Sequence, residues 1–138
     1  MPLHLSSCFF ATIVLHAYYI QIPIYHHTFL VLTVTSILFH TTHGEIIRRI
    51  DKFLAHFSFV IILMDTPKAL AANAAWLLFF PTAAACMWFG QSLLPDRKNE
   101  LHLCLHLFSV VGVHVYLWVL YHTGIMHPSI IHPIPLIV

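Results

Sequence analysis

Long apolar stretches, interrupted by only a few charged residues, constrain this chain more than any other feature of its sequence. Hydrophobic residues make up 59% of the 138 residues, and Asp, Glu, Lys and Arg together make up 8%. An ordinary soluble domain carries roughly 25% charged residues. Six basic and five acidic side chains cannot cover the surface of a soluble globule of this size. We therefore expect an all-α integral membrane protein whose outer surface mostly faces lipid.

The charged residues divide the chain into five apolar segments, and a membrane-spanning helix needs about 20 mainly apolar residues. We expect a single domain over residues 1–138, a bundle of about five transmembrane helices, and a kink at Pro81. Asp65 and Lys68 flank Pro67 in an expected solvated turn. The proline-rich tail, 122–138, is expected at the membrane interface or packed against protein. The five predicted segments are 5–25, 27–43, 50–64, 69–90 and 101–121.

The basic residues predict the orientation of such a bundle. With five spans, the amino terminus, the connection after the second span and the connection after the fourth lie on one side. That side carries all the basic residues except Lys68, and the positive-inside rule places it in the cytosol. No basic run is long enough for a nucleic-acid partner. Because the three cysteines form no CxxC pair, neither disulfides nor a thiolate metal site is indicated.

Histidine is unusually frequent, with 13 copies, and several of these lie on the predicted cytosolic side. Ser36 and His40 are four residues apart near the end of the second segment, and His102 and His106 are four apart at the start of the fifth. Residues at this spacing share one helical face. Asp51 opens the third segment, so His40, Asp51, His102 and His106 are expected at similar depth, with Ser36 one turn below His40.

Three histidines, two of them from one helix, are typical ligands of a catalytic zinc ion that keeps a fourth position for water. Such a zinc ion makes a bound water available as a nucleophile near neutral pH. We expect His40, His102 and His106 to be the ligands, and Asp51 to hold the water or orient a histidine. Ser36 could donate a hydrogen bond to a developing oxyanion. The pattern predicts metal-assisted hydrolysis.

Other histidines have simpler interpretations. His43 could replace His40 as a ligand, but a position at the membrane interface is the alternative. His16 and His114 are expected in the middle of the membrane, where one hydrogen bond to a neighbouring helix would satisfy each ring. His56 is expected to project away from the site.

The motif residues resemble those of a known family. The run Ser36-Ile-Leu-Phe-His40, Asp51 eleven residues after that histidine, and His102-Leu-Cys-Leu-His106 in a late helix are similar to the pattern of the CREST superfamily of membrane hydrolases. This superfamily includes alkaline ceramidases, phospholipases that remodel GPI anchors, and the progestin and adipoQ receptors. The spacing resembles that of alkaline ceramidases most closely. The motif-bearing stretches cover roughly half of the chain, at 28–60 and 100–121.

This resemblance implies a zinc-dependent hydrolase acting on an amide or ester bond of a membrane lipid such as ceramide. His40, His102 and His106 would bind Zn²⁺, while Ser36 and Asp51 would assist catalysis. In a eukaryotic cell it implies a multi-pass protein of the endoplasmic reticulum or Golgi. The superfamily has seven spans, so this chain would be a shortened CREST-like bundle. Removing two spans preserves the orientation of the motif helices, and two chains of a homo-oligomer could complete a lipid pocket between them.

Two other functions remain open at this stage. A haem-binding electron carrier would use pairs of histidines on facing helices, with His27 and His40 thirteen residues apart on one helix and His102 and His114 twelve apart on another. This alternative gives no role to Ser36 or Asp51. The other alternative is a non-catalytic subunit of a membrane assembly, or a receptor-like relative that keeps the metal for structure.

Overall fold

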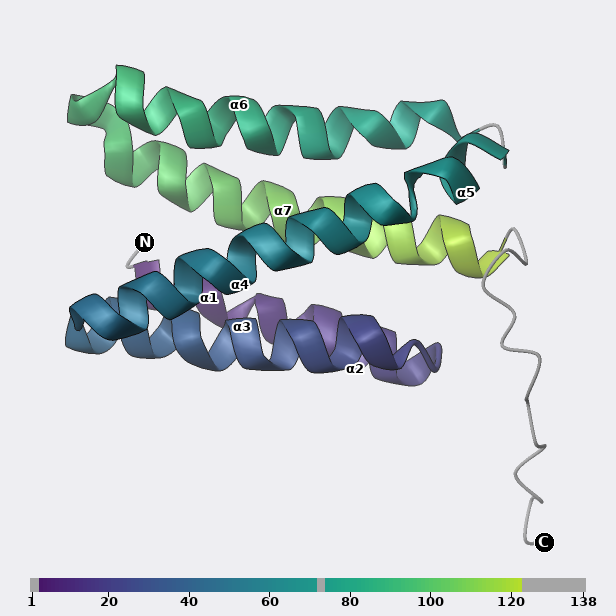
Figure 1. Cartoon of the computed structure of the whole chain (residues 1–138), viewed down its shortest axis with the longest axis horizontal. Helices are drawn as coiled ribbons and strands as arrows, with labels where there is room; N and C mark the ends of the chain where they lie inside the picture. The colour runs from purple at the N-terminus through teal and green to yellow at the C-terminus, as the bar shows by residue number, and fades with distance from the viewer. Residues whose placement is uncertain (1–2, 72–73, 123–138) are drawn as a thin grey trace, which may run out of the picture.

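The computed structural model describes residues 3–71 and 74–122, and these residues are almost entirely helical and contain no strand. They form five successive helical passes that run roughly along the long axis of the molecule (Figure 1). The all-α class expected from the sequence is therefore confirmed. The helices are α1 (Leu3–Cys8), α2 (Phe10–Tyr19), α3 (Pro23–Thr42), α4 (Glu45–Met64), α5 (Thr66–Ala71), η1 (Ala75–Leu78), α6 (Phe79–Leu93), η2 (Pro95–Arg97) and α7 (Lys98–His122).

Local sequence signals set the helix ends. Gln21 adopts a left-handed conformation, with φ of 61°, in the turn before α3, and Pro23 occupies the first turn of that helix. Proline is favoured there because the first-turn amides have no intrahelical partner. His43 ends α3 in the left-handed region at φ 55°, and α4 begins directly after Gly44. The second and third predicted segments therefore end close to their expected boundaries, 43 and 64. The first was expected to reach residue 25, but α2 ends at Tyr19 and α3 begins at Pro23.

The fourth segment differs from the expectation of one helix kinked at Pro81. It consists of α5, the short 3-10 helix η1 and then α6, and Pro81 lies in the first turn of α6. Proline has no N–H to donate to the preceding turn, so it suits a helix start and not a helix interior. The interruption therefore lies before the proline instead of at it.

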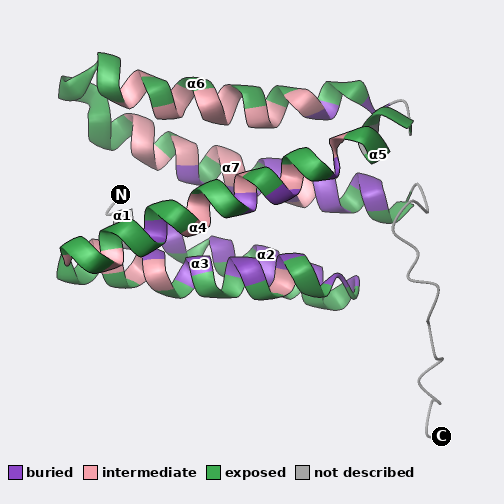
Figure 2. Ribbon diagram, in the orientation of Figure 1, coloured by how far each residue is buried: buried purple, intermediate pink, exposed green. Residues whose placement is uncertain are grey.

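The hydrophobic core lies between the first, second and last passes. It is built mainly from α2, α3 and α7, whereas α6 packs along α7 and contains no buried residue among those described (Figure 2). Fully or almost fully buried core residues include Ile13, Ala17, Tyr25, Leu117 and Leu120.

Large apolar side chains also cover the outside of the helices. Tyr19 is 81% exposed, Leu93 79% and Met64 73%. Of the described helical stretches, Pro95–His122 alone is both long and apolar enough to cross a membrane, and the apolar helix Leu5–Tyr19 is shorter. A core helix of a soluble protein can pass the same test, so the five expected spans remain a prediction.

The connection between α4 and α5 is less solvated than expected. Asp65 is buried, accepts a hydrogen bond from the Tyr25 hydroxyl at 2.8 Å and pairs with Lys68. Tyr25 is itself completely buried in α3. A buried carboxylate is tolerated when donors satisfy it. Asp65 is therefore part of the packed structure, contrary to the sequence expectation, whereas Pro67 and Lys68 are exposed, as expected for a solvated turn.

Candidate metal centre

Three histidines from two helices converge near one end of the molecule. His40 lies in the last turn of α3, and His102 and His106 lie in the first turns of α7. One ring nitrogen of each residue lies within 4.8 Å of the others. The ring centroids are 4.5 Å apart for His102 and His106 and 5.4 Å apart for His40 and His102. The three imidazoles are thus close enough to bind one metal ion.

The order of the helices explains why residues so far apart in sequence meet. The start of α1, the junction of α3 with α4 and the junction of α6 with α7 all lie at the same end of the bundle (Figure 1). The helix α3 runs toward that end and carries His40 in its last turn, whereas α7 starts there and carries His102 and His106 in its first turns. The four-residue spacing puts His102 and His106 on one face of α7. The agreement in depth inferred from the sequence thus matches the structure for all three histidines.

Ser36 and Asp51 form a second buried polar group beside this cluster. Ser36 is 1% exposed and lies one turn before His40, and Asp51 is 8% exposed in α4. The Ser36 side chain lies within hydrogen-bonding reach of the Asp51 carboxylate, and its Oγ is 2.9 Å from Ser7 Oγ. Asp51 Oδ1 is buried and has no hydrogen-bond partner among the described residues. Asp51 is not a member of the group that meets within 4.8 Å, so it is not placed as a metal ligand.

Two residues that the sequence analysis missed contact the histidine cluster directly. Ser6 Oγ of α1 lies 2.9 Å from His106 Nδ1, and Gln91 Oε1 of α6 lies 3.1 Å from His102 Nδ1. Ser6 is completely buried and Gln91 is half-buried. Both are polar residues at the end of the bundle where the motif residues were expected, Ser6 inside the first predicted segment and Gln91 just after the fourth, but no spacing links either of them to its histidine.

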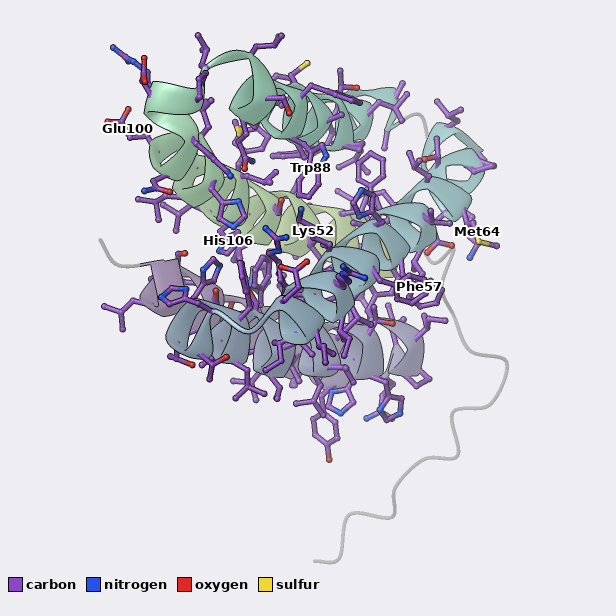
Figure 3. The ribbon with its side chains drawn as sticks, turned by 60° about the vertical axis from the view of Figure 1, so that its left-hand side comes forward. Lys52, Phe57, Met64, Trp88, Glu100 and His106 are labelled. Atoms are coloured by element: carbon purple, nitrogen blue, oxygen red, sulfur yellow. The ribbon has the colours of Figure 1, made fainter. Side chains whose placement is uncertain are left out.

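Basic side chains surround the same end. Lys52 and Lys98 are exposed, and both are near enough to His102 to interact with it electrostatically. Lys52 and His106 lie on facing sides of α4 and α7, while Glu100 projects outward (Figure 3). Arg48 and Arg49 instead pair with Glu45, and their hydrogen bonds hold the pKa of the Glu45 carboxyl below its usual range.

His43 and His56 do not belong to the three-histidine cluster. His43 is exposed at the end of α3 and does not belong to the three-histidine group, so its alternative role as a ligand has no support. His56 Nδ1 lies 2.6 Å from the carbonyl oxygen of Lys52, and its ring packs edge-on against Trp88. His56 is thus hydrogen-bonded within α4 and packed against α6. His127 and His132 lie outside the described residues.

His16 and His114 form a separate contact between α2 and α7. The Thr12 hydroxyl donates to the Phe9 carbonyl at 2.6 Å, so it must accept from His114 Nε2–H at 2.8 Å. His114 Nδ1 is then an acceptor, and His16 Nδ1–H donates to it at 2.8 Å. Each ring thus obtains a hydrogen bond from a neighbouring helix, as the sequence interpretation required.

These contacts bear on the haem alternative. His114, which one of the two expected haems would need, is hydrogen-bonded to His16 and Thr12. The other expected haem would lie between His40 and His102. The ring of His106 converges on the same point as these two rings, which leaves no room for a porphyrin between them. The described histidine contacts therefore favour a single metal ion over haem.

Comparisons of the chain with known protein families, with curated proteins and with solved structures find no match. The resemblance to the CREST superfamily therefore rests on the five motif residues and their spacing alone.

Proposed function

We propose that this protein is a zinc-dependent hydrolase of a lipid amide or ester, embedded in a membrane. One observation carries the proposal. His40, His102 and His106 converge on one point, with Ser36 and Asp51 buried beside them. These are the same five residues that resemble the CREST motif.

The outer surface supports a membrane environment. Large apolar side chains are exposed on every long helix, and α7 is long and apolar enough to cross a bilayer. In water, such a surface would leave large contiguous apolar areas hydrated, which monomeric soluble proteins rarely do. In lipid the same side chains face a solvent of matching polarity.

The donor set fits a zinc ion. Three imidazole ligands leave a fourth tetrahedral position open, which is the usual arrangement of catalytic zinc. The Nε2 atom of His102 is buried without a hydrogen-bond partner among the described residues, as a nitrogen reserved for a metal would be. A bound zinc ion would lower the pKa of a water molecule at its open position and polarise a carbonyl group.

The residues of the chain would then supply binding and proton transfer. Asp51 Oδ1 is a buried acceptor without a partner among the described residues, so it can orient the attacking water and take up its proton. Ser36 carries a hydroxyl one turn from His40 and can donate a hydrogen bond to the oxygen on which negative charge develops. The apolar helices would exclude bulk water and hold the lipid chains.

The substrate class follows from the resemblance and from the surroundings of the site. We propose a ceramide-like lipid, whose amide lies near the polar ends of its chains. The histidine cluster lies near the end of the bundle that carries Lys52 and Lys98, which would stand at the membrane surface. An amide or ester at the base of a lipid headgroup would reach this depth.

Metal analysis tests the proposal first. We expect near one zinc per chain in protein purified in detergent without chelators, and almost none in a His102→Ala, His106→Ala double variant. A His26→Ala, His27→Ala variant, which also loses two histidines but at the start of α3, should keep the metal. Absence of zinc from the unaltered protein would contradict the proposal.

Hydrolysis of short-chain fluorescent ceramide and of a matched ester then separates an enzyme from a structural metal protein. Asp51→Asn should retain zinc and lose turnover by about 100-fold or more, as expected for loss of a general base. A zinc-loaded protein that cleaves neither lipid would contradict the hydrolase assignment and favour the receptor-like or subunit alternative.

A further inference from the structure

The two histidines of α7 share a feature that the motif does not contain. Each ring uses its Nδ1 atom in a hydrogen bond to a side chain from another helix. Ser6 of α1 contacts His106 at 2.9 Å, and Gln91 of α6 contacts His102 at 3.1 Å. Neither partner lies on α3 or α4, which carry the other motif residues.

The chemistry of these contacts determines which ring nitrogen carries the proton and which carries the lone pair. A neutral imidazole carries one N–H, and an amide oxygen can only accept a hydrogen bond. Gln91 Oε1 therefore requires the proton of His102 to be on Nδ1, which leaves the lone pair on Nε2. That Nε2 atom is buried without a hydrogen-bond partner among the described residues.

The contact between Ser6 and His106 leads to the same arrangement. When Ser6 Oγ accepts from Nδ1–H, the lone pair of His106 is on Nε2. His106 is buried, and Phe10 packs edge-on against its ring with the centroids 5.2 Å apart, which further limits rotation of the ring.

We propose that Ser6 and Gln91 are positioning residues that hold His106 and His102 in the tautomer with the proton on Nδ1 and direct both Nε2 lone pairs to one metal ion. The inference rests on the proposed metal centre. It assigns to α1 and α6 a role in the site, although neither helix supplies a ligand. Hydrogen-bond partners of this kind change metal affinity by about 10–100-fold when they are removed.

The test measures tautomers in the metal-free protein and zinc affinity separately. Nitrogen-15 NMR of protein labelled on its histidines distinguishes the two tautomers, and the rings are assigned by their loss in His102→Ala and His106→Ala. Gln91→Leu and Ser6→Ala should each mix the tautomers of the histidine they contact. Competition with a chelator should show zinc binding weakened by about 10–100-fold in each variant.

Matched variants separate positioning from a general loss of structure. Ser7→Ala removes an equally buried hydroxyl from the same helix, and this hydroxyl lies 2.9 Å from Ser36 Oγ of α3. Because this hydroxyl is not a partner of either Nδ1 atom, the variant should keep both the tautomers and the zinc affinity. Gln91→Glu and Ser6→Thr keep an acceptor oxygen and should restore both properties to within about threefold of the unaltered protein.

Two results would overturn the inference. One is that the tautomers of His102 and His106 stay unchanged in Gln91→Leu and Ser6→Ala. The other is that Ser7→Ala weakens zinc binding as much as Ser6→Ala does, which would indicate a purely structural effect. If the protein binds zinc but hydrolyses no lipid, the proposed function fails, while the expected changes in tautomer and affinity would still support the inference.

Discussion

Gly112 of α7 is the position at which a single added methyl group should disturb the helix packing most clearly. A Cβ atom there would lie 2.8 Å from Phe80 Cδ1 and 2.9 Å from both Cβ and Cγ of the same residue. The best separation of two carbon atoms is about 3.5–4.0 Å. Because Phe80 Cβ is fixed to the backbone of α6, rotation of the ring cannot relieve the contact, and the two helices must separate by roughly 0.7 Å.

The expected cost can be set against the gain in helix propensity. Overpacking of this kind costs about 1–3 kcal/mol, and the clash with three atoms, one of them Cβ, places Gly112→Ala in the upper half of that range. Replacing glycine by alanine inside a helix stabilises the helix by about 1 kcal/mol. The net loss in the free energy of unfolding should therefore be about 1–2 kcal/mol.

Gly90→Ala provides the matched control. Its Cβ would meet only Leu101 Cδ1, at 3.6 Å, which is an ordinary contact, so this variant should gain up to about 1 kcal/mol. The difference between the two variants, about 2–3 kcal/mol, isolates the packing cost because both gain the same propensity. Unfolding by sodium dodecyl sulfate in mixed micelles, followed by circular dichroism, measures both. Equal stability of the two variants would refute the close approach of α6 and α7.

Two further predictions concern polar contacts between side chains that are distant in sequence. Tyr25→Phe removes a donor from the buried Asp65 carboxylate and should lower the free energy of unfolding by about 1–3 kcal/mol. The control Tyr18→Phe, at a residue that is 65% exposed, should change the free energy of unfolding by less than about 0.5 kcal/mol. A similar loss in both variants would contradict the role of the Asp65 contact. His114→Leu should cost about 1–3 kcal/mol because it leaves His16 without its acceptor, whereas the His16→Leu, His114→Leu double variant should recover much of that loss. The same unfolding assay distinguishes these outcomes, and additive losses in the double variant would argue against the hydrogen bond.

The sequence predicts the fold class and the histidine cluster because both depend on periodic or alternating patterns. Charged residues mark the ends of apolar helices, and a four-residue spacing fixes a shared face whatever the neighbouring helices do. The relative depth of His40, His102 and His106 then follows from the number of helices between them. Each of these inferences depends only on whether a helix runs toward or away from a given end of the bundle, and not on how its side chains pack against other helices.

The contacts made by Ser6, Gln91 and Asp65 could not be predicted in the same way. Each is a single polar residue whose partner lies on a helix distant in sequence, and no spacing rule connects the two. Asp65 next to Lys68 and Pro67 resembles an exposed turn until Tyr25 is seen to reach it. The division of the fourth segment before Pro81 likewise depends on the backbone conformation of a few residues, which the pattern of apolar residues does not specify.

The contacts between the first and last passes also govern the order in which the protein can assemble. Ser6 and His106 are 100 residues apart, and His16 and His114 are 98 apart. A nascent chain emerging at about 5–20 residues per second therefore carries its first helix for several seconds before α7 exists to close the bundle. During that interval the polar faces of α1 and α2 lack their partners from α7, so the site cannot form before α7 has been synthesised.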